Sequence, residues 1–187
     1  MNTRNRQWIE GAVFLAGFAA CIPLANYMIG HVGTICVPDG PCLIPVWFGL
    51  TAPSGVLLVG LALVLRDLVQ RRLGLAWAIG AIIVGAFLST TFTAPALALA
   101  SVSAFLTSEL VDLLVFTPLQ KKGLVKAAFV SSVAGLVVDS VVFLSLAFGS
   151  LEFLTGQVVG KLIMVVVALP VLIWIRNRDK KIGLTMA

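Results

Sequence analysis

The stretch from Leu75 to Leu119 contains no lysine or arginine and is apolar over most of its length. One membrane-spanning helix needs about 20 such residues, so this stretch is too long for one span and fits two spans joined by a tight turn. Hydroxyl side chains and Pro95 interrupt the apolar pattern at residues 89–95, and we expect the turn there.

Similar apolar runs elsewhere in the chain predict further spans. Of the 187 residues, 60% are hydrophobic and 11% are charged, whereas soluble domains have about 25% charged residues. The bilayer must therefore solvate most of the surface. We predict an all-α, polytopic fold, with residues 1–187 forming a single transmembrane domain. The six predicted helices are 8–29, 45–65, 75–90, 95–118, 127–148 and 154–175.

The basic residues indicate the orientation of these spans. Apart from Lys161, which lies inside the sixth span, all lysines and arginines occur before the first span or after the second, fourth and sixth, and the loops at 30–44, 89–95 and 149–153 contain none. The positive-inside rule then places both termini in the cytoplasm. A cleaved signal peptide at the start would break this alternation, so we expect the first helix to be retained.

The composition also argues against several classes of function. The net charge of +5 comes from residues between apolar runs and forms no basic patch with interleaved aromatics, so no nucleic-acid partner is expected. His31 is the one histidine and lies in a loop, and the chain has no phosphate-binding loop. We therefore expect no enzymatic activity, cofactor or metal. We expect the lipid bilayer to surround most of the chain.

Cys36 and Cys42 flank a short loop on the predicted outer side. That side of an inner membrane is oxidising, and Pro38, Gly40 and Pro41 favour a turn that brings the two sulfurs together. A disulfide closing such a loop would contribute about 2 kcal/mol. Both the disulfide and a pair of free thiols are consistent with the sequence.

Four ionisable residues lie inside predicted spans: Glu109, Asp112, Asp139 and Lys161. Each costs at least about 2.5 kcal/mol in a membrane, so such residues are candidates for function. Glu109 and Asp112 are three residues apart and share a helix face. All four fall at similar depth, which predicts that they converge on one cavity. The alternative is a structural salt bridge between Lys161 and Asp139 or Asp112, which would explain one acid and not three.

Uncharged polar residues extend the candidate site. Asn26, Ser108 and Gln157 lie in or beside the predicted spans, where each could contact a ligand or form a hydrogen bond between helices. Gln157 precedes Lys161 by four residues and shares its face. Arg66 follows the second predicted span, either as an orientation anchor or as the lining of a cytoplasmic gate.

Gly156 and Gly160 form a small-xxx-small pair in the last span. Such pairs permit close approach of two helices. The pair can serve packing within the monomer or the formation of a homodimer.

Three segments carry a family resemblance: Ala104–Phe116, Ser131–Ser140, and Lys161 with Pro170 downstream. With Asn26-Tyr27 and Arg66, they make the chain resemble the vitamin uptake transporter (VUT) family, whose best-characterised branch is the bacterial queuosine precursor transporter. The resemblance implies six helices in a bacterial inner (plasma) membrane. It also implies import of 7-deazaguanine bases, namely 7-cyano-7-deazaguanine or its aminomethyl form.

The chain departs from that branch at three places, one of which is the loop between Cys36 and Cys42, which is unfamiliar in the family. The branch has an acidic residue inside the second helix, and residues 60–65 contain none. Glu109 stands where the branch has an amide.

The predicted chemistry fits a purine-like base. A guanine-like edge has two adjacent N–H donors, and one carboxylate, Asp139 or Asp112, can accept both. Lys161 could donate to the carbonyl oxygen of the base or hold the other acid. Two further functions are consistent with the sequence. One is a substrate-binding subunit of a multi-component vitamin importer, and the other is a non-transport membrane assembly protein in which the charges hold the helices together.

Overall fold

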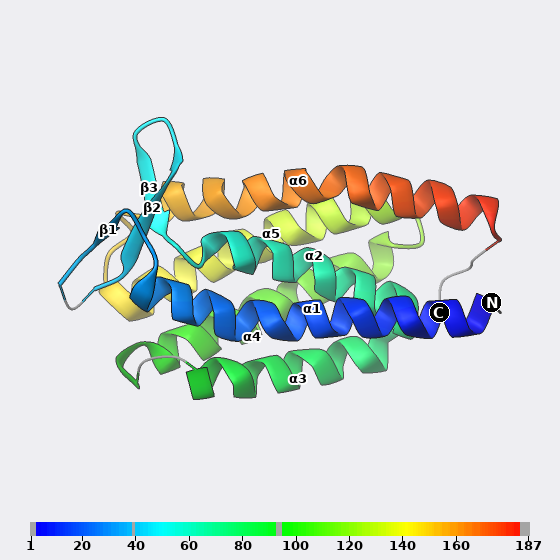
Figure 1. Ribbon diagram of the computed structural model, residues 1–187, viewed down its shortest axis with the longest axis horizontal. Helices are drawn as coiled ribbons and strands as arrows, with labels where there is room; N and C mark the ends of the chain where they lie inside the picture. The colour runs from blue at the N-terminus through cyan, green and yellow to red at the C-terminus, as the bar shows by residue number, and fades with distance from the viewer. Residues whose placement is uncertain (1–2, 39, 93–94, 184–187) are drawn as a thin grey trace.

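The computed structural model describes residues 3–38, 40–92 and 95–183. Six helices in this part of the chain lie side by side along one long axis (Figure 1). Helix α1 begins and helix α6 ends at the same end of the bundle, which we call the terminal end (Figure 1). The opposite end carries a small β-sheet and is called the sheet end. The helices are α1 (Thr3–His31), α2 (Val56–Leu73), α3 (Leu75–Phe92), α4 (Pro95–Leu119), α5 (Leu124–Phe148) and α6 (Leu154–Lys181).

The helices α1, α4, α5 and α6 are long and apolar enough to cross a membrane, and α3 is a shorter apolar helix. The polytopic, mainly helical membrane fold is thus confirmed. The predicted turn between the third and fourth helices falls partly on residues 93 and 94, which lie outside the described part of the chain.

The second helix differs from its prediction. The predicted span at 45–65 begins eleven residues too early, because α2 starts only at Val56. Pro45, Gly49 and Pro53 interrupt this apolar run, and proline and glycine disfavour a helix interior. A short apolar run cannot be assigned to helix or strand from hydrophobicity alone. The shift in register moves Arg66 from the predicted helix end to near the middle of α2.

The residues before α2 form a sheet that the all-α prediction missed. Within the described residues it has three antiparallel strands in the order β1 (Ile35–Cys36), β2 (Cys42–Trp47) and β3 (Leu50–Pro53). The β2–β3 hairpin extends sideways from the sheet end of the bundle (Figure 1). Gly49 at its tip has φ +71°, a conformation that glycine adopts without strain.

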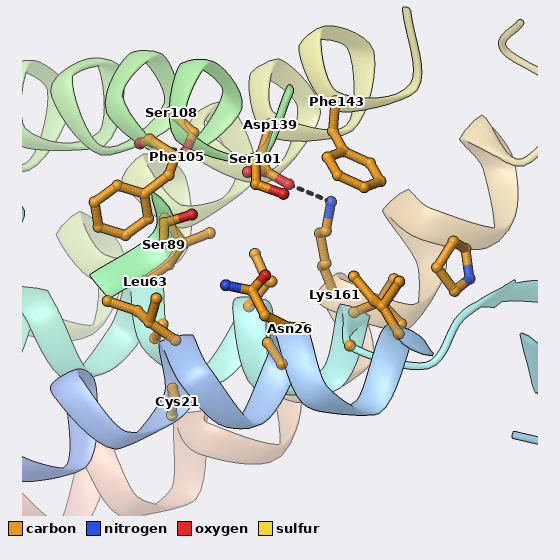
Figure 2. A pocket seen from close by; sticks show the side chains of 18 of the residues that line it. Cys21, Asn26, Leu63, Ser89, Ser101, Phe105, Ser108, Asp139, Phe143 and Lys161 are labelled. Carbon is orange, nitrogen blue, oxygen red and sulfur yellow. Dashed lines mark hydrogen bonds and ion pairs between the residues drawn. The ribbon is translucent and has the colours of Figure 1, made fainter. Parts of the chain in front are cut away.

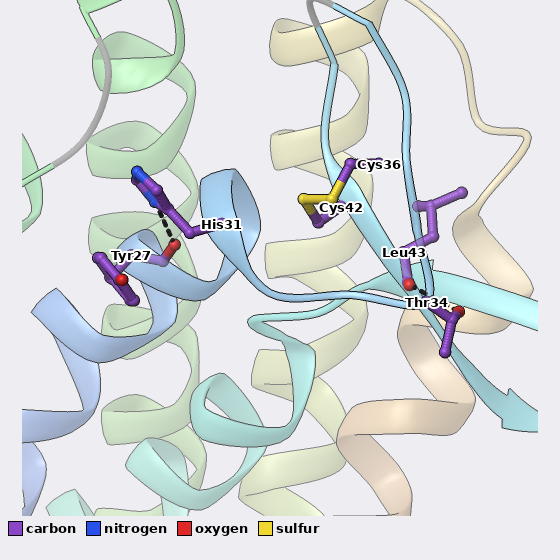
Figure 3. The surroundings of a disulfide bond; sticks show 6 residues. All are labelled: Tyr27, His31, Thr34, Cys36, Cys42 and Leu43. Atoms are coloured by element: carbon purple, nitrogen blue, oxygen red, sulfur yellow. Dashed lines mark hydrogen bonds between the residues drawn. A yellow bond between two sulfur atoms is a disulfide. The ribbon is translucent and has the colours of Figure 1, made fainter.

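Cys36 and Cys42 form a disulfide in the structure (Figure 3). The two residues are paired across β1 and β2, and Thr34 Oγ1 donates a hydrogen bond to the carbonyl oxygen of Leu43 at 3.1 Å beside them. The disulfide closes the loop between the first two strands and holds β1 against the sheet.

The glycine pair of α6 packs inside the chain. A Cβ atom at Gly156 would meet the carbonyl oxygen of Thr51 in β3, and one at Gly160 would meet the side chain of Val56. Gly60 of α2 likewise lies against the backbone of Lys161. These close approaches bring α2, α6 and the hairpin together, so the pair has a packing role within the monomer.

Ion pairs hold the terminal end together. Arg72 of α2 donates two hydrogen bonds of 2.9 Å to Asp179 of α6 and one of 2.9 Å to Glu10 of α1. Arg178 donates to the same Glu10 at 2.6 Å. We call Glu10, Arg72, Arg178 and Asp179 the terminal clamp. It joins α1, α2 and α6 at the end where the chain begins.

Candidate functional site

A cavity of about 70 Å³ lies in the half of the bundle nearer the sheet end. Helices α1, α3 and α5 contribute residues from their second halves, α2 and α6 contribute residues from their first halves, and α4 contributes residues on both sides of its middle. Most of the wall is apolar, and Phe105 and Phe143 lie on it (Figure 2). The polar lining residues are Asn26, Ser89, Ser101, Ser108, Glu109, Asp139, Gln157 and Lys161.

Lys161 forms the centre of a buried polar group at one side of this cavity. Its Nζ donates to Asp139 Oδ2 at 2.6 Å, to Gln157 Oε1 at 2.6 Å and to Ser140 Oγ at 2.8 Å. The side chain is 1% exposed. The predicted pairing of Lys161 with Asp139 is confirmed. Because an ammonium group has three N–H donors and all three are used here, Lys161 has none left for a ligand unless a bond breaks.

Asp139 and Asn26 present unused polar atoms to the cavity. Asp139 is 8% exposed, and within the described residues its Oδ1 accepts no hydrogen bond. The Nδ2 of Asn26 is buried without a hydrogen-bond partner in the same part of the chain. Figure 2 shows the Asn26 amide pointing from α1 into the cavity. The cavity therefore offers an acceptor from α5 and a donor from α1.

Arg66 lies in a second buried polar group, deeper in the bundle. Its side chain is fully buried, and its Nε donates to Glu109 Oε2 at 2.9 Å. Its Nη2 lies 2.6 Å from Asp112 Oδ1, and its Nη1 lies 2.9 Å from Asp67 Oδ1. The guanidinium also lies over the ring of Phe116, at 5.9 Å from the ring centroid. We call Arg66, Asp67, Glu109 and Asp112 the Arg66 cluster.

The structure corrects two of the predicted placements. Arg66 was expected at the end of the second span, as an anchor or the rim of a gate, and it is instead enclosed within the bundle. Asp112 was expected in the cavity with Glu109, Asp139 and Lys161, but it does not line the cavity. Asp112 pairs with Arg66 behind it. Glu109 belongs to both places, because it lines the cavity and pairs with Arg66.

Asp67 is the important residue that sequence reasoning missed. It lies within α2, is fully buried, and accepts a hydrogen bond of 3.1 Å from Ser131 Oγ at Oδ2. The prediction ended the second span at Leu65, so Asp67 fell in a loop. The signal that would have found it is the proline and glycine pattern at 45–53, which argues for a later helix start.

The other predicted polar residues lie on the cavity wall. Gln157 holds Lys161. Ser108 donates to the carbonyl oxygen of Phe105 at 3.0 Å, so its hydroxyl proton is used within α4. No cluster of three or more histidine, cysteine or carboxylate side chains suited to a metal ion is found in the described ranges.

Residues 90–175 match a protein-family model described as "Putative vitamin uptake transporter". This match supports membership of the chain in the vitamin uptake transporter family. The match covers α4 and α5 and most of α6, which carry Glu109, Asp112, Asp139 and Lys161. No curated protein and no solved structure is significantly similar to the chain. The family match and the apolar helices together support a multi-pass membrane protein of the transporter class.

Proposed function

We propose that this VUT family member imports a purine-like base, specifically 7-cyano-7-deazaguanine or its aminomethyl form, across the bacterial inner membrane. The proposed orientation places the terminal end in the cytoplasm and the sheet end outside. The observation that carries the proposal is a pair of polar atoms without a hydrogen bond within the described residues, Asp139 Oδ1 and Asn26 Nδ2, at one cavity with aromatic rings on its wall.

The chemistry of the base matches these atoms. Its pyrimidine edge has two adjacent N–H donors next to a carbonyl oxygen. Asp139 can accept from the donors, and the Asn26 amide can donate to the carbonyl oxygen. Exclusion of water strengthens both interactions. Phe105 and Phe143 offer faces on which a flat ring can stack.

Import also requires a route that opens on one side at a time. The cavity lies toward the sheet end, whereas the Arg66 cluster and the terminal clamp lie between it and the terminal end. In the proposed orientation the described state is therefore closed toward the cytoplasm. Because α2 carries Arg66 and Arg72, one in each ion network, a movement of α2 would open both.

A thermal-shift assay on the purified chain tests the binding step. A ligand that binds only the folded state stabilises it in proportion to the logarithm of its concentration over its Kd. We expect 7-cyano-7-deazaguanine to raise the melting temperature, and riboflavin or biotin to leave it unchanged. Asp139→Asn should abolish the shift.

The matched control is Glu152→Gln, which changes an exposed carboxylate in the loop between α5 and α6 and should leave the shift intact. Absence of a shift with every 7-deazaguanine and purine tested would contradict the proposal and favour an assembly role.

A further inference from the structure

The Arg66 cluster contains more negative than positive charge. Three carboxylates, from Asp67, Glu109 and Asp112, surround one guanidinium, and the four side chains are at most 2% exposed. Fully ionised, the cluster would hold two uncompensated negative charges inside an apolar bundle. Within the described residues the other buried cation near the cavity is Lys161, and Asp139 already pairs with it.

Protonation of one carboxyl group removes part of this excess. Neighbouring carboxylates in a water-excluded site do not all ionise, because each disfavours the charge on the next. The groups that face the cluster come from three helices. Helix α2 supplies Arg66 and Asp67, α4 supplies Glu109 and Asp112, and α5 supplies Ser131 and, toward the cavity, Asp139.

The hydrogen bonds indicate where the proton lies. Asp112 Oδ2 is buried and has no hydrogen-bond partner among the residues that the structure describes. Asp67 Oδ1 and Asp112 Oδ1 both lie against the Arg66 guanidinium, at 2.9 Å from Nη1 and 2.6 Å from Nη2, so the two carboxyl groups are neighbours. An ionised carboxylate can only accept hydrogen bonds, so two of them cannot bond to each other, whereas a protonated carboxyl can donate to its neighbour. A single proton between Asp67 and Asp112 satisfies the buried oxygen and lowers the charge excess.

We infer that Asp67 and Asp112 form a proton-binding site, and that this proton is the coupling ion of transport. The second part rests on the proposed function. Glu109 connects the two sites, since it lines the cavity and accepts the Arg66 Nε–H. A base that donates an N–H hydrogen bond to Glu109 weakens the bond between Glu109 and Arg66. The positive charge of the guanidinium then compensates the negative charges of Asp67 and Asp112 more fully. The carboxyl O–H bond breaks, and the proton passes to water on the terminal side.

Infrared spectroscopy of the full chain in lipid, without substrate, tests the site directly. A protonated carboxyl group has a C=O absorption separate from that of a carboxylate. We expect this absorption in the wild-type protein at neutral pH, and its loss in Asp112→Asn and in Asp67→Asn. Asp139→Asn and Glu152→Gln are the controls and should retain it. Absence of the absorption in the wild-type protein would overturn the site, as would its loss only in Glu109→Gln.

Uptake into proteoliposomes then tests the coupling. With one proton per base, a gradient of one pH unit supports about tenfold accumulation. Asp112→Asn should bring the base only to equal concentrations on both sides. Equal wild-type uptake with and without the gradient would overturn the coupling. A protein that has the infrared absorption but transports none of the bases would refute the proposed function and leave the proton site standing.

Discussion

The pair Lys161–Asp139 gives the sharpest prediction about stability. The two charged atoms are 2.6 Å apart, and Lys161 is 1% exposed. Removal of one partner leaves the other charge buried and unpaired, which costs about 3–5 kcal/mol in soluble proteins. We therefore expect both Lys161→Met and Asp139→Asn to destabilise the protein in detergent.

The free-energy cost of each single variant should lie at the low end of that range. After Asp139→Asn, Lys161 keeps the acceptors Gln157 and Ser140, and the new amide oxygen can still accept. After Lys161→Met, Asp139 loses its cation. Because Asp139 is partly exposed to the cavity, hydration offsets some of that loss. Both costs should therefore lie near or below about 3 kcal/mol.

The double variant isolates the interaction between the two residues. It removes both charges, so it should be more stable than the sum of the single losses predicts, by about 0.5–3 kcal/mol. Reversible unfolding by denaturant in detergent micelles measures the four proteins of the cycle. The control cycle pairs Lys161→Met with Glu152→Gln, which lies in an exposed loop and should be additive. Additive losses in the Lys161–Asp139 cycle would show that the two charges do not interact.

Three further predictions follow from the cavity and the sheet. Asn26→Leu should weaken base binding about tenfold, the value of one hydrogen bond of about 1.4 kcal/mol, as measured by titration calorimetry; unchanged affinity would remove Asn26 from the site. Cys21 is free, buried and on the cavity wall, so bound base should slow its reaction with a small thiol reagent. An unchanged labelling rate at saturating base would contradict the position of the site. Reduction of the Cys36–Cys42 disulfide, which closes a separation of six residues, should lower stability by about 2 kcal/mol in the chain-entropy model. Equal unfolding midpoints with and without reductant would show that the bridge has no such effect.

Much of the helical framework could be predicted from the sequence, because a long apolar run free of basic residues has few alternatives to a membrane helix. The helix starting at Leu75 and the helices near 95–118, 127–148 and 154–175 follow the apolar runs closely. The pairing of Lys161 with Asp139 could also be predicted, since the two residues lie at similar distances from the sheet end on adjacent helices.

The register of α2 could not be predicted in the same way. Its preceding strands are as apolar as a membrane helix, and hydrophobicity alone does not separate the two. Because the predicted start of α2 was wrong, the burial of Arg66 and Asp67 was not predicted. The division of the acidic residues between two polar groups was not predicted either. Which side of α4 faces the cavity depends on how α4 packs against α5 and α3, so the different positions of Glu109 and Asp112 required the structure.

Uptake of 7-cyano-7-deazaguanine by proteoliposomes that contain this chain as their only protein tests the proposed transport directly. We predict uptake without ATP, its loss in Asp139→Asn, and wild-type uptake in Glu152→Gln. Binding of the base without uptake would contradict a self-sufficient transporter and indicate a subunit of a larger importer. Full uptake by Asp139→Asn would contradict the assigned binding site.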